Sequence, residues 1–431
     1  MTHQAPPLRA PDLRAIAETL FAALRAAGGG SDATPDIGVS RDSYGAGETE
    51  ALAVIEQTAR AHGLACHRDA AANLVVILPG TARDLPAIAC GSHLDSVPRG
   101  GNYDGAAGVV AGLLALISLR ESGITLRRDI HLYALRGEES AAFGRAYIGS
   151  SALFGELGAD DLALSHATTG QTLAARLADV GADLPRIARR ETLLDPTSLA
   201  CWLELHIEQG PVLLARNLPL AAVTGLRGNV RHRSVLCLGE AGHSGAVPRW
   251  LRHDAVFAVA DLLARLDGHW QRLIAQGHDL VMTIGVIGTD PAEHAIARIP
   301  GKVAFSFEAR SDSEATLDSV HALFLAECDR VAEERGVRFI PDRRLDTRPA
   351  RLDAALVGRV RAAIRRLGLA DEPIASGAGH DAAVFVQAGV PSAMIFVRNA
   401  NGSHNPAEAM TIDDFMLGAE ALRQCLAEGA E

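Results

Sequence analysis

Helical and strand-like patterns of apolar residues alternate along the first third of the chain. Apolar residues recur at helical spacing in 11–27 and in 48–62, and each segment is closed by glycine, which predicts two helices. Short apolar runs bounded by turn residues or charge predict strands at 74–78, 87–90 and 130–135, with a helix at 105–122 between the last two. Residues 1–10 lack such a pattern and are predicted to be disordered. The order strand, helix, strand favours parallel pairing with a crossover.

Acidic and imidazole side chains follow these strands directly. His93 comes just after the strand at 87–90, and Glu138 with Glu139 follows the strand at 130–135. The carboxyl ends of parallel strands meet at one edge of a sheet, where the loops carry catalytic residues. We therefore expect these side chains to lie together.

The pattern changes in the middle of the chain. After helices and loops at 141–200, a strand at 201–207 carries His206. Next come strands in 223–238, a helix at 250–267, strands at 281–287 and 302–307, and a helix at 314–335. A helix at 352–368 and a strand at 391–397, which leads to His404, then resume the first pattern. The sequence predicts an α/β domain with a central, mostly parallel sheet, built from residues 1–221 and 347–431, and an α+β domain inserted at 222–346.

Composition narrows the class of protein. Of the 431 residues, 48% are hydrophobic and 22% are charged, so the chain has enough apolar residues for a sizeable core. The net charge of −11 argues against a nucleic-acid partner. The six cysteines have no CxxC spacing, which favours free thiols in a reducing compartment over disulfides. The N-terminal residues have no apolar signal segment, and the longest apolar run, 109–119, is too short to cross a bilayer. We expect a soluble, cytoplasmic protein.

Five potential metal ligands lie in five separate segments: His93, Asp104, Glu139, His206 and His404. Imidazole and carboxylate groups suit Zn, Mn, Ni or Co. With a carboxylate able to bridge, the set fits a centre of two divalent cations, which at about 3.5–4 Å apart share a hydroxide and polarise a carbonyl oxygen. Each residue alone has a plainer interpretation, such as a surface histidine or, for Asp104 before Gly105, a turn. Their coincidence at one sheet edge favours the metal centre.

Other acidic residues are placed to support these ligands. Asp95, two residues after His93, is expected to accept the second ring N–H and so fix the tautomer, and Glu208 stands in the same relation to His206. Neighbouring side chains on an extended segment point to different sides, so Glu138 and Glu139 require two roles. One binds metal, and the other takes the proton from the attacking water.

Seven segments resemble the M20 metallopeptidase clan and, within it, the hydantoinase/carbamoylase amidase family, which includes N-carbamoyl-L-amino acid hydrolases, allantoate amidohydrolases and β-ureidopropionases. They are GSHLDSVPRGGNYDG (91–105), GEES (137–140), LHIEQGPVL (205–213), AGHSGAVP (241–248), IPGKVAFSFEARSD (299–312), SGAGHDA (376–382) and NGSHNPAEAM (401–410). The resemblance implies a metal-bearing α/β domain with an inserted lid domain that also forms a homodimer. It implies two divalent cations held by the five ligands above, with Asp104 bridging.

The resemblance also implies individual roles. Glu138 would be the general base, and His243 would reach a neighbouring active site and steady the tetrahedral oxyanion. Arg310 would grip a substrate carboxylate, a contact for which a guanidinium is suited. Gln209 would contact substrate. His380 and Asp381 would support the site from the GHDA loop.

One departure from the family bears on the substrate. Carbamoylases of the family usually have Asn two residues before the IPG segment, where this chain has Ala297, and Arg298 or Asn229 are candidates to replace the contact. The first hypothesis is an amidohydrolase of N-carbamoyl, ureido or related amides that carry a carboxylate. The alternatives are a dipeptidase or N-acyl amino acid deacylase and, more remotely, an inactive binding protein on the same fold.

Overall fold

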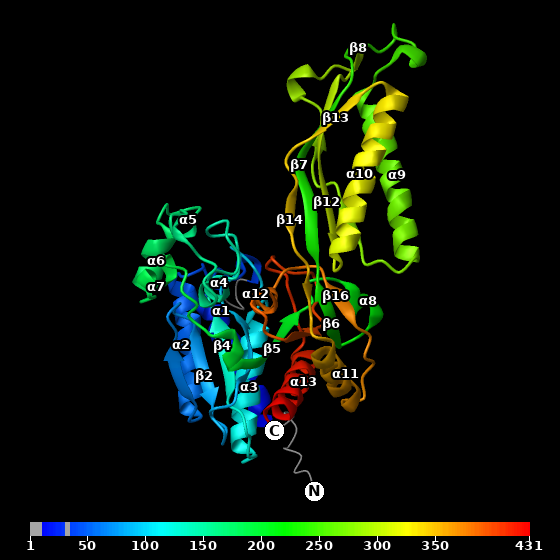
Figure 1. Cartoon of the computed structure of the whole chain (residues 1–431). Helices are drawn as coiled ribbons and strands as arrows, with labels where there is room; N and C mark the ends of the chain where they lie inside the picture. The colour runs from blue at the N-terminus through cyan, green and yellow to red at the C-terminus, as the bar shows by residue number, and fades with distance from the viewer. Residues whose placement is uncertain (1–10, 31–34) are drawn as a thin grey trace. The chain divides into compact units, whose positions relative to one another are not determined.

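The computed structural model describes residues 11–30 and 35–431, so the predicted disorder of residues 1–10 falls outside the described residues. The chain divides into two compact units. Met1–Thr224 with Leu352–Glu431 forms the first, and Gly225–Arg351 forms the second, which is inserted into it (Figure 1).

A mixed sheet forms the centre of the first unit. Its strands run in the order β1 (Ala65–Arg68), β2 (Leu74–Leu78), β4 (Ile130–Leu135), β3 (Ala87–His93), β5 (Leu199–Ile207), β17 (Ser392–Val397) and β6 (Leu220–Leu226), and both β15 (Ala350–Arg351) and β16 (Ile374–Ser376) pair with β6. The three central pairings, β4–β3, β3–β5 and β5–β17, are parallel. The pairings β1–β2, β2–β4 and β17–β6 are antiparallel. The prediction of a mostly parallel sheet is therefore wrong at the edges. One reason is that β1 and β2 are joined by a tight turn, and a connection this short allows only antiparallel pairing.

Helices cover the sheet of the first unit. The longer ones are α1 (Pro11–Ala27), α2 (Ala46–Ala61), α3 (Ala106–Glu121), α11 (Ala354–Arg366) and α13 (Ile412–Ala430). The shorter ones are α4 (Ile148–Leu153), α5 (Ala159–Leu162), α6 (Leu173–Asp179), α7 (Leu184–Ala188), α8 (Val212–Arg216) and α12 (Asp381–Gln387). The predicted bounds of α1 are confirmed.

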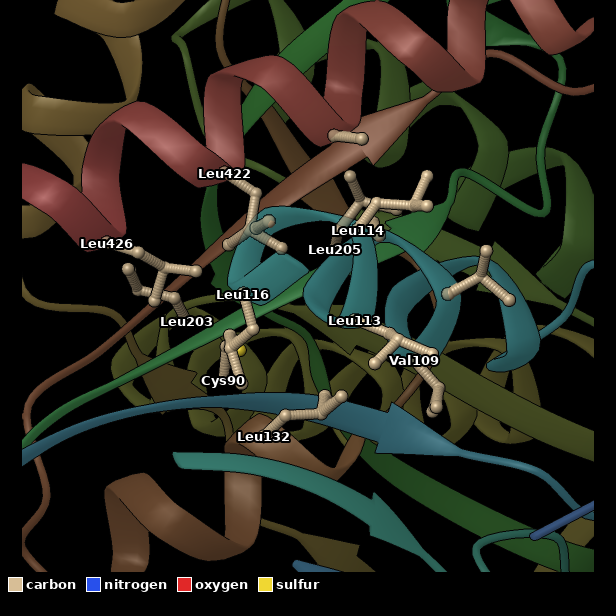
Figure 2. Close-up of a cluster of buried hydrophobic side chains, with 14 of the residues drawn as sticks. Cys90, Val109, Leu113, Leu114, Leu116, Leu132, Leu203, Leu205, Leu422 and Leu426 are labelled. Carbon is tan, nitrogen blue, oxygen red and sulfur yellow. The ribbon is translucent and has the colours of Figure 1, made fainter. Parts of the chain in front are cut away.

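Helix α3 is the centre of the hydrophobic core. Every residue from Ala106 to Leu119 is buried, as a helix that is apolar on all sides requires. Figure 2 shows α3 between Cys90 and Leu132 of the strands and Leu422 of α13. A Cβ at Gly108 would lie 2.2 Å from the carbonyl oxygen of Leu205, so the helix can approach β5 only because this residue is glycine. This close packing brings the segment just before α3 to the end of β5.

The second unit is an antiparallel sheet with two helices. Its strands are β7 (Gly228–Leu238), β9 (Val281–Thr283), β10 (Ile287–Gly288), β12 (Lys302–Ser311), β13 (Arg338–Pro341) and β14 (Leu345–Thr347), and its helices are α9 (Ala255–Ala275) and α10 (Glu314–Arg335). Side chains of β12 alternate between buried and partly exposed, and the buried Phe307 stacks on Phe324 of α10 at 4.1 Å between ring centroids. A separate ribbon pairs β8 (Gly242–His243) with β11 (Arg298–Ile299). Both helices lie along the same face of the sheet (Figure 1).

Two further observations concern the cysteines and the apolar helices. All six cysteines are free thiols, and all but Cys66 are buried. Among residues 11–30 and 35–431, no helix has both the length and the apolar character needed to cross a membrane.

Candidate metal centre

The five candidate ligands converge where neighbouring parallel strands end. His93 closes β3, Glu139 follows β4, His206 lies near the end of β5, His404 follows β17, and Asp104 lies just before α3. The strands β4, β3, β5 and β17 are neighbours in this order, and their carboxyl ends face the same edge. The sheet thus assembles residues that are as much as three hundred positions apart.

The carboxylate of Asp104 lies at the middle of the cluster. Its Oδ1 is 3.2 Å from Nε2 of His206 and 3.5 Å from Nε2 of His93. Its Oδ2 is 3.3 Å from Nε2 of His404, and that nitrogen is 3.2 Å from Oε1 of Glu139. Two triads of possible ligand atoms therefore meet at Asp104, one on each of its oxygens, and a third group, Glu204, His206 and His380, shares His206 with the first.

Hydrogen bonds at Nδ1 direct the Nε2 atoms of His93 and His206 toward Asp104, although Nε2 of His206 also accepts the backbone N–H of Gly105 at 3.1 Å. Nδ1 of His93 donates to the carbonyl oxygen of Asp95 at 3.1 Å, and Nδ1 of His206 donates to that of Ile207 at 2.9 Å. A neutral ring with its proton on Nδ1 has a lone pair on Nε2. Oδ1 of Asp104 is buried and has no hydrogen-bond partner among the described residues. Two imidazole lone pairs beside an unsatisfied carboxylate oxygen fit a divalent cation.

Charge within the cluster is strongly coupled. Burial alone would raise the pKa of Asp104, but the imidazoles of His206, His404 and His93 together hold it well below its usual range. Asp104, followed by Glu139, raises the pKa of His404 to about 10. Burial opposes protonation of His93, yet Glu138, Asp104 and Asp95 together raise its pKa well above the ordinary value. The site stabilises positive charge, as a cation site must.

Asp95 supports the site more widely than the sequence predicts. Its Oδ1 is 3.3 Å from Nδ1 of His93, although the ring donates to the backbone carbonyl of Asp95. The two oxygens of Asp95 also accept the backbone N–H groups of Glu138 and Glu139, each at 3.0 Å, and the hydroxyl of Ser43 at 2.7 Å. This buried carboxylate therefore fixes the turn that carries both glutamates.

The two neighbouring glutamates face different surroundings. Glu139 contacts His404, whereas Oε2 of Glu138 lies 3.9 Å from Nε2 of His93. Burial raises the pKa of Glu138 well above its usual range, an effect that His93 reduces and Glu139 reinforces. A buried carboxyl group with a raised pKa is suited to accepting and returning a proton.

Glu208 does not orient His206, which corrects the expectation from spacing. Its two oxygens accept the backbone N–H groups of Val212 and Leu213, each at 2.7 Å, and so satisfy the free amides at the start of α8. The chain turns after β5, which directs this carboxylate along the following helix. The neighbouring Gln209, with φ of 62°, donates from Nε2 to Oδ2 of Asp104 at 2.8 Å.

The GHDA loop packs behind the cluster. The ring of His380 lies edge-on to that of His206 at 4.4 Å between centroids, and burial lowers the pKa of His380 well below its usual range. Asp381 accepts the hydroxyl of Ser150 at 2.5 Å, and burial raises its pKa to about 7. These contacts give both residues supporting positions in the site.

Two buried glutamates near the ligands are absent from the sequence prediction. Glu204 accepts the hydroxyl of Ser92 at 2.9 Å and the backbone N–H of Ala382 at 2.9 Å. It lies two residues before His206 on β5. Residues two apart on a strand point to the same face of the sheet, so the sequence alone could have placed Glu204 near the ligands. Glu408 contacts the backbone of Asp104 across 304 positions, for which no local signal exists.

Within the inserted unit, His243 lies on the β8–β11 ribbon. It is directly opposite Arg298, and the N–H of Ser244 donates to the carbonyl oxygen of Ala297 at 2.8 Å. Nδ1 of His243 accepts the N–H of Gly245 at 3.1 Å. The exposed ring thus lies on a ribbon segment that is paired with Ala297 and Arg298.

Arg310 and Asn229 are cross-strand partners on β12 and β7. Nη2 of Arg310 is 3.2 Å from Oε1 of Glu308, and Asn229 is buried. A guanidinium and an amide side by side can bind a carboxylate.

A family model described as peptidase family M20/M25/M40 matches residues 89–428. The chain belongs to this family. It is 34% identical to an N-carbamoyl-L-amino acid amidohydrolase of Geobacillus stearothermophilus, over 90% of this chain and 92% of that protein. It is 29% identical to an allantoate amidohydrolase of Escherichia coli K12, over 90% of this chain and 92% of that protein.

Among solved structures, a hydantoinase/carbamoylase family amidase from Burkholderia ambifaria aligns with a TM-score of 0.85 at 30% identity, covering 97% of this chain and 98% of that one. These similarities confirm the family resemblance. The chain is an M20 amidohydrolase, and the metal dependence of this family agrees with the ligand groups around Asp104.

Proposed function

We propose that the chain is an amidohydrolase with two divalent cations that cleaves a linear C–N bond in a small substrate bearing a carboxylate. The observation that carries this proposal is the position of Asp104, whose two oxygens each face a separate set of ligands. His93 and His206 would hold one cation with Oδ1, and Glu139 and His404 would hold the other with Oδ2. When bound, the cations would polarise the substrate carbonyl and activate water.

Glu138 would move the proton. It is buried beside His93, and it is not part of any of the possible ligand groups found among the described residues. Asp95 holds the backbone N–H of Glu138, and the carboxylate of Glu138 would accept a proton from water and return it to the leaving nitrogen. Burial raises the pKa of Glu138 well above its usual range, which supports a role in accepting a proton.

The inserted unit would supply the groups that bind substrate. His243 would donate a hydrogen bond to the oxyanion, Arg310 would bind the carboxylate, and Asn229 or Arg298 would replace the contact that Ala297 lacks. We also propose that this unit forms a homodimer, as the resemblance to the amidase family implies. Sedimentation equilibrium of the full chain tests this, and a monomer at micromolar concentration would contradict it.

An N-carbamoyl or ureido substrate is supported by the relatives named above. A dipeptide or N-acyl amino acid is the second candidate, because Ala297 provides no side-chain amide for a ureido group. A buried polar group left without its partner costs about 1–3 kcal/mol, so Ala297 would weaken selection for a ureido group.

The test is a substrate panel on protein reconstituted separately with Zn, Mn, Co and Ni. N-carbamoyl, N-acyl and dipeptide forms of one amino acid are compared by kcat/KM. Preference for the carbamoyl form supports the first candidate, and preference for the acyl or dipeptide form supports the second. A metal-loaded protein that is inactive on the whole panel would favour a binding protein on this fold.

A further inference from the structure

Glu408 connects two ligand segments across 304 positions of the sequence. Its Oε1 accepts the backbone N–H of Tyr103 at 2.8 Å and that of Asp104 at 3.3 Å. Glu408 itself is only 7% exposed. The backbone that carries the shared carboxylate is therefore held by a side chain from the loop after β17.

The hydroxyl of Ser403 completes the connection. It lies 2.5 Å from Oε2 of Glu408 and 2.6 Å from Oδ2 of Asp104. Ser403 immediately precedes His404, whose Nε2 is 3.3 Å from the same Oδ2. Glu408 thus reaches both the backbone and, through Ser403, the side chain of Asp104.

Gly101 makes room for this contact. A Cβ at Gly101 would lie 2.0 Å from Cδ and 2.1 Å from Oε1 of Glu408, far closer than unbonded carbon and oxygen atoms approach. The second glycine of the Gly100-Gly101 pair therefore does more than form a turn. It leaves space for the carboxylate at the one place from which the carboxylate can accept the amides of 103–104.

We propose that Glu408 is a positioning residue of the metal centre that holds Oδ2 of Asp104 next to His404. This rests on the proposed centre of two cations. Gly101 leaves the space that the Glu408 side chain requires. Ser403 contacts Oδ2, which belongs to the triad with Glu139 and His404, whereas Oδ1 faces His93 and His206. Loss of Glu408 therefore weakens cation binding at Glu139 and His404 more than cation binding at His93 and His206. Supporting contacts of this kind change metal affinity by about 10–100-fold.

The experiment measures metal binding without turnover. Metal-free full-length protein is titrated with Zn²⁺ against a competing chelator and with Co²⁺ by visible absorption. The variants are Glu408→Ala, Glu408→Gln and Gly101→Ala. The matched controls are Gly358→Ala, where a Cβ meets no atom within 4 Å, and Asp413→Ala, which removes an exposed carboxylate.

The two equivalents of bound metal are expected to respond differently to these variants. Glu408→Ala and Gly101→Ala weaken one equivalent at least about tenfold and change the Co²⁺ spectrum, while the other equivalent binds nearly as in wild type. Glu408→Gln stays close to wild type, because its carbonyl oxygen accepts the amides and its NH₂ donates to Ser403. The double variant Gly101→Ala/Glu408→Ala is no weaker than Glu408→Ala, since both changes remove one contact.

Wild-type affinity for both equivalents in Glu408→Ala would overturn the proposal, as would a loss in Glu408→Gln as large as that in Glu408→Ala. If Glu408→Ala does not fold, Gly101→Ala compared with Gly358→Ala decides in the same way. A wild-type protein that binds fewer than two equivalents would instead overturn the centre of two cations.

Discussion

The backbone N–H of Gly245 donates a hydrogen bond of 3.1 Å to Nδ1 of His243. Because Nδ1 is the acceptor, the proton of the neutral imidazole resides on Nε2. The exposed edge of the ring is therefore a hydrogen-bond donor before any substrate binds. A donor fixed in this way is what stabilisation of an oxyanion requires.

His243→Ala should lower kcat by about 10²–10³-fold, the usual cost of removing one oxyanion donor. Circular dichroism and metal content should not change, because His243 is an exposed residue of a two-stranded ribbon. Steady-state kinetics checks this. His294→Gln, in the same unit, is the control and should retain activity. Equal kcat in His243→Ala and wild type would remove His243 from the mechanism.

Glu138→Gln and Glu139→Gln form a matched pair. Loss of the proton acceptor in Glu138→Gln should reduce kcat by about 10²–10⁴-fold, with metal content near wild type. Loss of a charged ligand in Glu139→Gln should instead reduce bound metal, because Glu139 contacts His404 directly. Elemental analysis and kinetics on the same preparations distinguish them. Full activity in Glu138→Gln would exclude it as the base.

Metal binding should depend on pH through His404. Asp104 and Glu139 raise the pKa of this imidazole to about 10, so it is protonated in the metal-free protein at neutral pH. A ligand must lose its proton, so cation binding should release protons and strengthen as pH rises toward about 10. Calorimetry in buffers of different ionisation enthalpy counts the protons, and His404→Ala should release fewer. Metal affinity that falls with rising pH would contradict this.

The same shift affects the stability of the metal-free protein. A raised folded pKa means that the contribution of His404 is fully present below its unfolded pKa near 6.5 and is lost as pH rises through about 10. Chelator-treated wild type should therefore lose more thermal stability over this window than His404→Ala does. Parallel melting curves for the two proteins would argue against the shift.

Arg310→Ala should mainly raise KM for substrates with a carboxylate, by about 10–100-fold if a charged hydrogen bond worth about 1.5–3 kcal/mol is lost. Arg231→Ala is the matched control, because Arg231 also pairs with Oε1 of Glu308, at 2.6 Å, from the neighbouring strand. The comparison uses amide substrates with and without the carboxylate. An equal effect on both would assign Arg310 a structural role.

Glu208→Ala should cost about 1–3 kcal/mol of folding stability, since it leaves the amides of Val212 and Leu213 without their partner. Metal affinity should remain that of wild type, because His206 is oriented by the carbonyl of Ile207. Urea unfolding and Zn²⁺ titration test the two statements separately. Weakened metal binding at unchanged stability would indicate that Glu208 orients the imidazole of His206.

Local patterns predict much of the fold. The bounds of α1 and of α10 follow from apolar spacing and from capping residues that act within a few positions. The parallel pairing of β3 and β4 follows from the helix between them. The antiparallel edges of the sheet and the covering helix α13 do not follow, since they depend on what the rest of the chain leaves uncovered.

For this protein, the sequence alone determined the kinds and order of the ligands, because His93, Asp104, Glu139, His206 and His404 lie in recognisable local segments. Only the tertiary structure decided which oxygen of Asp104 faces which imidazole, because that depends on how strands far apart in sequence align. It also turned Glu208 away to the start of α8 and brought Glu408 into the space beside Gly101. Spacing along a chain specifies side chains within a few residues, whereas contacts across three hundred residues are specified by packing.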